Sequence, residues 1–227
     1  MKKNIVTNHL NIIAVFAGLL LMCYPGLQAQ TVLNPVDNQI DSVRENRDSI
    51  WKYVEAPEAI EKAKIWYAAN CPEGVFLDAS DGKQMQMRAE WSQAFATQYD
   101  SLEVVETNIM TKGRILFLDP EVSGKYNETH DPKYMQCYTR LVFKTNRTTG
   151  ITVGCLMTVI PNLEWLEKSN FKPFMEVTYL FRSKDFGGMI WFHNLDGSFS
   201  NGWKYEKGKI VASIKSMDAA NPIQFIS

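Results

Sequence analysis

The spacing of apolar residues changes along the chain, from helical in the first third to alternating afterwards. Between Asp37 and Val54 the apolar positions approximate helical spacing and predict a first helix. Between Pro57 and Asn70 a clearer apolar stripe predicts a second helix, with inward-facing Ile60, Ala63, Trp66 and Tyr67. Proline suits the first position of that helix, and Pro72 ends it because proline disfavours helical geometry in the residue before it.

The middle of the chain predicts strands and one long loop. Residues 85–97 fit a helix and a strand equally well. Residues 102–110 contain neighbouring valines and predict a strand, and residues 114–118 predict a short buried strand. Residues 119–132 are polar and hold two prolines and a glycine, so a loop is expected there.

A hairpin is the strongest strand signal, with arms at residues 134–144 and 151–160 around a turn at 145–150. Pairing Phe143 with Ile151 brings the apolar faces of the two arms together. In that register Cys137 and Cys155 are diagonal neighbours about 7–8 Å apart, farther than a disulfide normally spans. We therefore expect two buried thiols and no disulfide in this hairpin.

A short helix and a series of strands complete the pattern. Asn162 suits the cap of a short helix that begins after Pro161. Residues 216–227 lack periodicity and are expected to fray. Further strands are expected at residues 175–181, 188–193, 198–205 and 209–214.

Together these elements predict an α+β fold. N-terminal helices are expected to pack on one face of a curved, mostly antiparallel sheet of about six to eight strands. The expected organisation is a signal peptide at 1–29, a partly helical extension at 30–55, a single domain at 56–216 and a tail at 217–227.

The start of the chain has the features of a secretory signal peptide. Lys2 and Lys3 precede an uncharged apolar run from Ile12 to Cys23, which is shorter than the ~20 residues needed to span a bilayer. Ala29 is a small residue at the expected cleavage site before Gln30. Two alternatives remain open: an uncleaved anchor, and lipidation at Cys23, which would tether the protein to a membrane.

Charge restricts the classes of partner. Loss of Lys2 and Lys3 with this segment, which holds no acidic residue, changes the formal net charge from −1 to −3. Basic residues are scattered, so nucleic acid is not expected as a partner. Contact with a membrane is expected only if Cys23 is lipidated, and the remaining partner classes are a protein or an envelope component.

Reactive side chains form no recognised motif. Without Cys23 an odd number of cysteines is left, Cys71, Cys137 and Cys155, which is untypical of a disulfide scaffold. Buried free thiols are expected, and a single bridge is the alternative. Cys71 ends a predicted helix, where the negative pole of the dipole disfavours a thiolate. His130 and His193 lack the spacing of a metal site or a serine-nucleophile motif. No catalytic residue, metal site or cofactor is predicted.

Hydrolysis of a glycan requires two carboxylates on either side of the sugar. Glu103 with Glu106, and Asp185 with Asp196, are the pairs that could flank a sugar. Their spacing does not distinguish them from solvated loop charges.

Aromatic residues on the last strands provide the candidate binding surface. By alternation, Phe199, Trp203 and Tyr205 share one face of a strand, and Trp191 lies on the neighbouring strand. Such residues usually build the core, and the alternative is an exposed platform that stacks on a sugar or a partner.

The segment from His193 to Ile210 (HNLDGSFSNGWKYEKGKI) resembles a block in an uncharacterised family of exported proteins from gut Bacteroidetes. Thr158-Val159-Ile160-Pro161 followed by Leu166 is similar to the upstream part of that block. The resemblance covers the second half of the chain and implies a compartment and a type of organism, without a mechanism. Some members continue into a tail rich in glycine and cysteine, which is absent here.

The leading functional hypothesis is an exported, non-catalytic binding or structural protein. The alternative is a secreted hydrolase with a site built from loops. A cleft that holds His130 or His193 against a carboxylate would favour the hydrolase.

Overall fold

The computed structural model describes residues 52–54, 56–78, 84–171, 177–214 and 224–226. All of them belong to one compact unit, Asp48–Ser227. The expected signal peptide, Cys23 and most of the expected first helix lie outside the described residues. The last three residues of that expected helix are described, and they form strand β1 (Lys52–Val54). The helix prediction was therefore wrong there.

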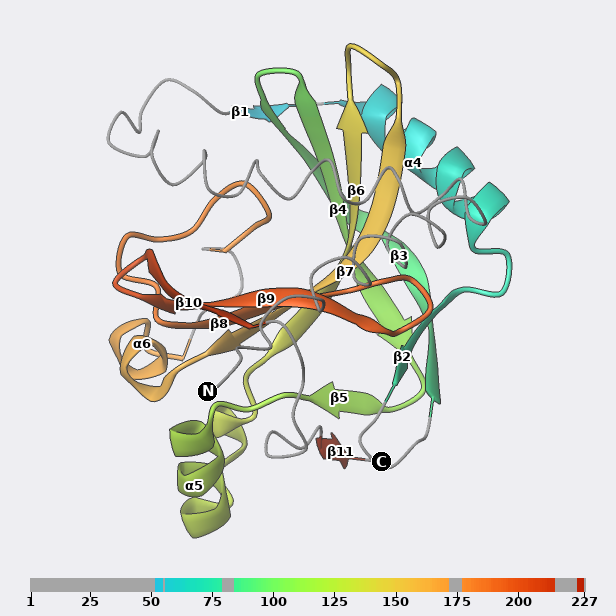
Figure 1. Cartoon of the computed structure of the whole chain (residues 1–227). Coiled ribbons are helices and arrows are strands. Elements are labelled where there is room, and N and C mark those ends of the chain that lie inside the picture. Colours follow the sequence, from blue (N-terminus) through green and yellow to red (C-terminus); the bar gives the residue numbers. More distant parts are fainter. Residues whose placement is uncertain (1–51, 55, 79–83, 172–176, 215–223, 227) are drawn as a thin grey trace, which may run out of the picture. The chain divides into compact units, whose positions relative to one another are not determined.

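A large antiparallel sheet dominates the described residues (Figure 1). Eight strands form a row in the order β1-β3-β4-β6-β7-β8-β9-β10, and β2 pairs with β3 beside β1 as the ninth strand. The bounds are β1 Lys52–Val54, β2 Val75–Asp78, β3 Gln84–Tyr99, β4 Leu102–Thr111, β6 Tyr138–Asn146, β7 Thr152–Pro161, β8 Gly188–His193, β9 Phe199–Glu206 and β10 Lys209–Ile214. The predicted strands at 102–110, 188–193, 198–205 and 209–214 are confirmed within a residue.

Helices occur along the described chain rather than only at its start. The helix α4 (Pro57–Asn70) confirms the second predicted helix. Two more lie between strands, α5 (Pro120–Thr129) and α6 (Leu163–Lys168), and a 3-10 turn covers Pro132–Tyr134. An α+β fold with an antiparallel sheet is therefore confirmed, whereas confinement of the helices to the N-terminal part is not.

The main core lies between α4 and one face of the sheet. Ala59 and Ala63 of α4 are buried against strand residues that include Val105, Leu141 and Leu156. A cluster of rings closes this layer, with Trp91 stacked on Phe143 at 5.6 Å and both helix aromatics, Trp66 and Tyr67, edge-on to the same phenylalanine.

The hairpin register differs from the prediction by three residues. Phe143 pairs with Gly154, and Asn146 closes the turn by donating to the Ile151 carbonyl at 2.9 Å. An odd shift exchanges the two faces of a strand. The alternation rule failed because β7 is buried on both faces, so its apolar pattern fits either orientation. The prediction of no disulfide is confirmed, although Cys137 is only half-buried.

The expected loop at 119–132 is mostly α5. Asp119 caps this helix, because its Oδ1 accepts the Glu121 N–H at 3.0 Å, and Pro120 occupies the first position. Val122 is fully buried, and Tyr126 packs against the same small cluster. The sequence did not predict this helix because most of its residues are polar and exposed. A single buried valine gives almost no helical periodicity of apolar positions.

Two other segments differ from expectation. A strand was expected at residues 175–181, but residues 177–182 form a turn closed by a bridge between Val177 and Arg182. Residues 175 and 176 of that prediction lie outside the described residues. Within the expected frayed tail, β11 (Gln224–Ile226) pairs with β5 (Arg114–Leu116) in a separate two-stranded sheet.

Candidate functional site

A pocket of about 530 Å³ lies where α5, α6 and the β8–β9 strands meet. This volume is within the usual range for small-molecule sites. Its wall contains both helix N-termini and the glycine pair that precedes and begins β8. The charged residues that line it are Asp119, Glu121, Glu164, Lys168, Asp185, Lys204, Glu206 and Lys207.

Both helix N-termini at the pocket carry their own caps. Asp119 caps α5 as described above, and Asn162 Oδ1 accepts the Trp165 N–H at 2.9 Å. Capping occupies donors that an anion would otherwise contact. The predicted role of Asn162 is thereby confirmed.

The glycine pair lets the chain pass close to the α6 cap. A Cβ on Gly187 would lie 2.6 Å from the side-chain nitrogen of Asn162. Gly188 has φ +140, and a Cβ there would lie 2.3 Å from the Ile160 carbonyl oxygen. This wall of the pocket therefore requires glycine at position 188, whereas a side chain at position 187 would displace the Asn162 cap.

Two ion pairs lie among the exposed residues that line the pocket, and this exposed side is here called its mouth. Lys168 Nζ lies 3.2 Å from Asp185 Oδ2, and Lys204 Nζ lies 3.2 Å from Glu206 Oε1. All four side chains are substantially exposed, so each pair adds little stability. They give the mouth both hydrogen-bond donors and acceptors.

Asp119 is a half-buried carboxylate in the wall of the pocket. Burial raises its pKa, against the opposing effects of the N–H groups of α5 and of Lys204. A carboxyl group that retains its proton more readily is what a general acid needs. Its cap role, however, already uses one of its oxygens.

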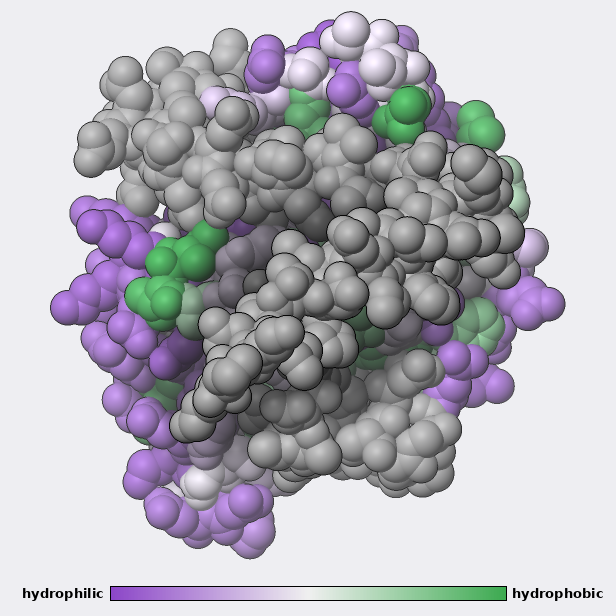
Figure 2. All heavy atoms as spheres, in the orientation of Figure 1, coloured by the Kyte–Doolittle hydropathy of each residue, from purple (hydrophilic) through white to green (hydrophobic). Residues whose placement is uncertain are grey.

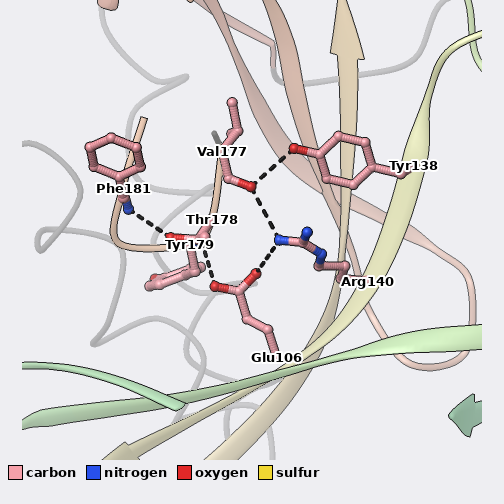
Figure 3. A network of polar contacts seen from close by, with 7 residues as sticks. All are labelled: Glu106, Tyr138, Arg140, Val177, Thr178, Tyr179 and Phe181. Atoms are coloured by element: carbon pink, nitrogen blue, oxygen red, sulfur yellow. Dashed lines mark hydrogen bonds and ion pairs between the residues drawn. The ribbon is translucent and has the colours of Figure 1, made fainter. Parts of the chain in front are cut away.

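Figure 3 shows a second polar cluster, around Glu106 and Arg140. It lies on the opposite face of the sheet from α4, because Val105 and Leu141, the neighbours of these two residues along their strands, pack in the core with α4. Glu106 of β4 is fully buried, and its Oε2 lies 3.3 Å from Arg140 Nη1 of β6. Its other oxygen accepts the Tyr179 N–H at 2.8 Å. The cluster thus joins two strands to the turn at 177–182.

Arg140 connects to the same turn. Its Nη1 donates to the Val177 carbonyl at 3.2 Å, and Tyr138 Oη donates to that carbonyl at 3.0 Å. The rings of Phe95 and Tyr138 flank the guanidinium at 5.2 and 4.9 Å. Cation–π contacts of this kind stabilise a cation that is removed from water.

Burial raises the pKa of Glu106, although Arg140, the Tyr179 N–H and Arg182 oppose the shift. Removing a charge from water is costly, and the attraction of a neighbouring cation offsets that cost only in part. The Glu106–Arg140 pair is therefore a structural element whose loss would be expensive.

The four predicted aromatic residues do not form one exposed platform. Trp191 and Tyr205 are buried, at 4% and 0% exposure. Phe199 packs edge-on to Trp191, whereas Trp203 packs edge-on to Phe192 on the other face of β8. A bulge between Phe192 and His193 breaks the alternation and sends Phe199 to the opposite face.

The predicted carboxylate pairs are also separated. Glu103 and Glu106 are three positions apart on one regular strand, so they point to opposite faces. Asp185 lines the pocket, whereas Asp196 accepts the Ser198 N–H at 2.9 Å in the turn before β9.

Neither His130 nor His193 lines the pocket. His193 is 1% exposed and packs between Phe117 and Phe199, at 6.1 and 5.4 Å. His130 is exposed and ends α5 in a left-handed conformation, with φ 53. Cys71 is buried at the end of α4, and burial raises its pKa, which disfavours the reactive thiolate.

The pocket and the Glu106–Arg140 pair were not predicted as sites. The sequence Asp119-Pro120-Glu121 is typical of a helix start and could have revealed α5. The ion pair had a weaker signal: β4 carries two glutamates and β6 two basic residues, and these charges cannot be matched before the strand order is known.

The described surface is mostly hydrophilic in the view of Figure 2, where hydrophobic colours occupy small separate areas. Large exposed apolar side chains are scattered over different elements: Ile65, Met110, Ile151 and Val211. Within the described ranges, no three metal-ligating side chains converge on a common point. No helix there is long and apolar enough to cross a bilayer.

Comparison with known proteins adds no relative. No protein-family model, curated protein sequence or solved structure matches the chain. The functional argument therefore rests on the geometry of the pocket and of the buried ion pair.

Proposed function

We propose that the protein is an exported, non-catalytic binding protein whose ligand site is the pocket between α5, α6 and the β8–β9 strands. The observation that carries this proposal is the state of three carboxylates in the pocket. Asp119 caps a helix, and Asp185 and Glu206 are paired with lysines. Groups that already have partners within the protein can bind a ligand, but they are poorly placed to exchange protons with a substrate.

A small polar molecule, or a polar side chain of a partner, fits this site best. The mouth offers lysine donors and carboxylate acceptors around one cavity. Ligand pockets typically use a few fixed polar groups of this kind to orient what they bind.

The export part of the proposal rests on the sequence of residues 1–29 and on the resemblance to exported proteins of gut Bacteroidetes. Mass analysis of the secreted protein tests it. A mature chain beginning at Gln30 is expected, whereas an acylated Cys23 at the start would establish a lipoprotein.

The ligand site is tested by filling it. Glu164 is exposed and lines the pocket, and Glu167 is exposed on the same helix but does not line it. Amino acids, monosaccharides and short oligosaccharides are screened by NMR shift perturbation. We expect Glu164→Trp to weaken the binding of a hit at least tenfold and Glu167→Trp to leave it unchanged. Equal binding by both variants would place the ligand elsewhere.

A secreted hydrolase is the second candidate, and the raised pKa of Asp119 is the observation that favours it. Turnover of an oligosaccharide that is lost in Asp119→Asn would establish it. Asparagine caps helices as well as aspartate does, so this variant keeps α5 intact.

A further inference from the structure

Residues 177–187, here called the strap, contact both the buried ion pair and the pocket. The first part of the strap lies on the Glu106–Arg140 pair through the Val177 carbonyl and the Tyr179 amide (Figure 3). Its last part supplies Asp185 and Gly187 to the wall of the pocket. One short segment therefore connects two features on separate parts of the sheet.

The end of the strap near the pocket is anchored by an aromatic contact and by backbone hydrogen bonds. Phe186 is fully buried, with its ring 5.1 Å from that of Trp165 and 5.5 Å from that of Tyr205. The Phe186 carbonyl accepts the Gly208 N–H at 2.7 Å, and the Gly187 carbonyl accepts the Asn162 N–H at 3.0 Å.

The middle of the strap is also packed on the sheet. The Arg182 guanidinium lies 5.0 Å from the Tyr205 ring and interacts electrostatically with Glu106. Tyr179 packs edge-on to Phe192 at 5.9 Å. Because the strap contacts the sheet at its start, middle and end, it can move away from the sheet only if several of these contacts break.

We propose that the strap couples the pocket to the Glu106–Arg140 pair. When the strap closes on the sheet the pocket wall is complete, and when the strap opens the wall is lost. The consequence for binding rests on the proposed function: a ligand that contacts Asp185 or Gly187 stabilises the closed strap, and closure strengthens its binding by the same factor. An open strap uncovers Phe192 and Tyr205 and separates the pocket wall from α6.

Amide hydrogen exchange in the ligand-free protein tests the coupling in both directions. Asp185→Asn removes the ion pair with Lys168 at the pocket end. We expect the distant Tyr179 amide to exchange about two- to fivefold faster, the effect expected for a lost surface ion pair. The matched control is Glu128→Gln, which breaks an exposed pair with Lys125 outside the strap and should leave Tyr179 unchanged.

Tyr138→Phe is the reverse test, and it removes one hydrogen bond at the ion-pair end without unpairing a charge. The amides of Gly208 and Asn162, which donate to the pocket end, should exchange a few-fold faster. Tyr67→Phe is the control, because it removes one tyrosine hydroxyl hydrogen bond, from the Ala89 N–H, on the α4 side of the sheet.

Two outcomes would overturn the proposal. Exchange that accelerates only beside each substitution would show two independent contacts. Equal acceleration of the Tyr179 amide and of core amides in β7 would show global destabilisation rather than motion of the strap. Because no ligand is used, a failed coupling test is distinguishable from a failed ligand screen, which bears on the proposed function alone.

Discussion

At the scale of single residues, the most consequential position is Glu106, a fully buried charge in the interior of strand β4. It is held by one guanidinium and one backbone amide from different parts of the chain. Sequence alone marks it as a carboxylate, and only the strand order shows that Arg140 lies diagonally across from it. Its chemistry therefore could not be predicted before the fold.

Removing one member of this pair should be severe. Glu106→Gln leaves Arg140 buried without its counter-charge, so we expect a loss of about 3–5 kcal/mol in the free energy of unfolding. Urea denaturation at neutral pH measures it. The double variant Glu106→Leu/Arg140→Met removes both charges and should be less destabilised than Glu106→Gln. A double variant at least as unstable as Glu106→Gln would contradict a coupled pair.

Two helix caps of different environment should respond oppositely to pH. Burial raises the pKa of Asp119 above its ordinary 3.8, so ionisation of this group opposes folding. As pH rises above 3.8, the wild type should therefore lose stability relative to Asp119→Asn. The effect should stay below about 1 kcal/mol because the group is partly exposed.

Asp131 provides the matched comparison. The Lys133 amide and side chain lower its pKa, so wild type gains stability over Asp131→Asn as pH rises, and that gain is lost on acidification. Denaturation midpoints of the three proteins from pH 3 to pH 7 measure both slopes. Slopes of the same sign would contradict the different environments of the two caps.

At the scale of elements, the sequence predicts most strands of the sheet well, but it predicts poorly the places where alternation breaks down. Alternation located β4, β8, β9 and β10 because each has turn residues at its ends. It failed for β7, which is apolar on both faces, and at the bulge in β9, where one extra residue reverses the pattern. The pocket was not predicted because part of its wall is α5, and the apolar stripe of this helix is too weak to be recognised in the sequence.

Glycines in two elements should show opposite responses to alanine. Gly124 lies in exposed α5, where an added Cβ meets no other atom within 4 Å. Gly124→Ala should raise stability by about 0.5–1 kcal/mol, since alanine has the better helix propensity. Gly188→Ala should lower it by at least about 1 kcal/mol because of the positive φ and the Ile160 carbonyl. Thermal denaturation compares the two, and stabilisation by Gly188→Ala would contradict the described wall.

At the scale of the whole molecule, the described fold is maintained without a disulfide. Cys71, Cys137 and Cys155 form none, and the expected mature chain holds no other cysteine. A reductant should therefore leave the melting temperature of that chain unchanged. A decrease on addition of dithiothreitol would reveal a bridge and contradict the structure.

The pairing of β11 with β5 has a practical consequence for attaching the protein to a surface. Leu116, the last residue of β5, precedes the pocket residue Asp119 by only a few positions, so a handle fused after β11 pulls on a strand that leads directly into the pocket. Immobilisation there would disturb the site that a biosensor is meant to report on. The turn that contains Thr148 and Thr149 is exposed and lines no part of the pocket, which makes it the better attachment point.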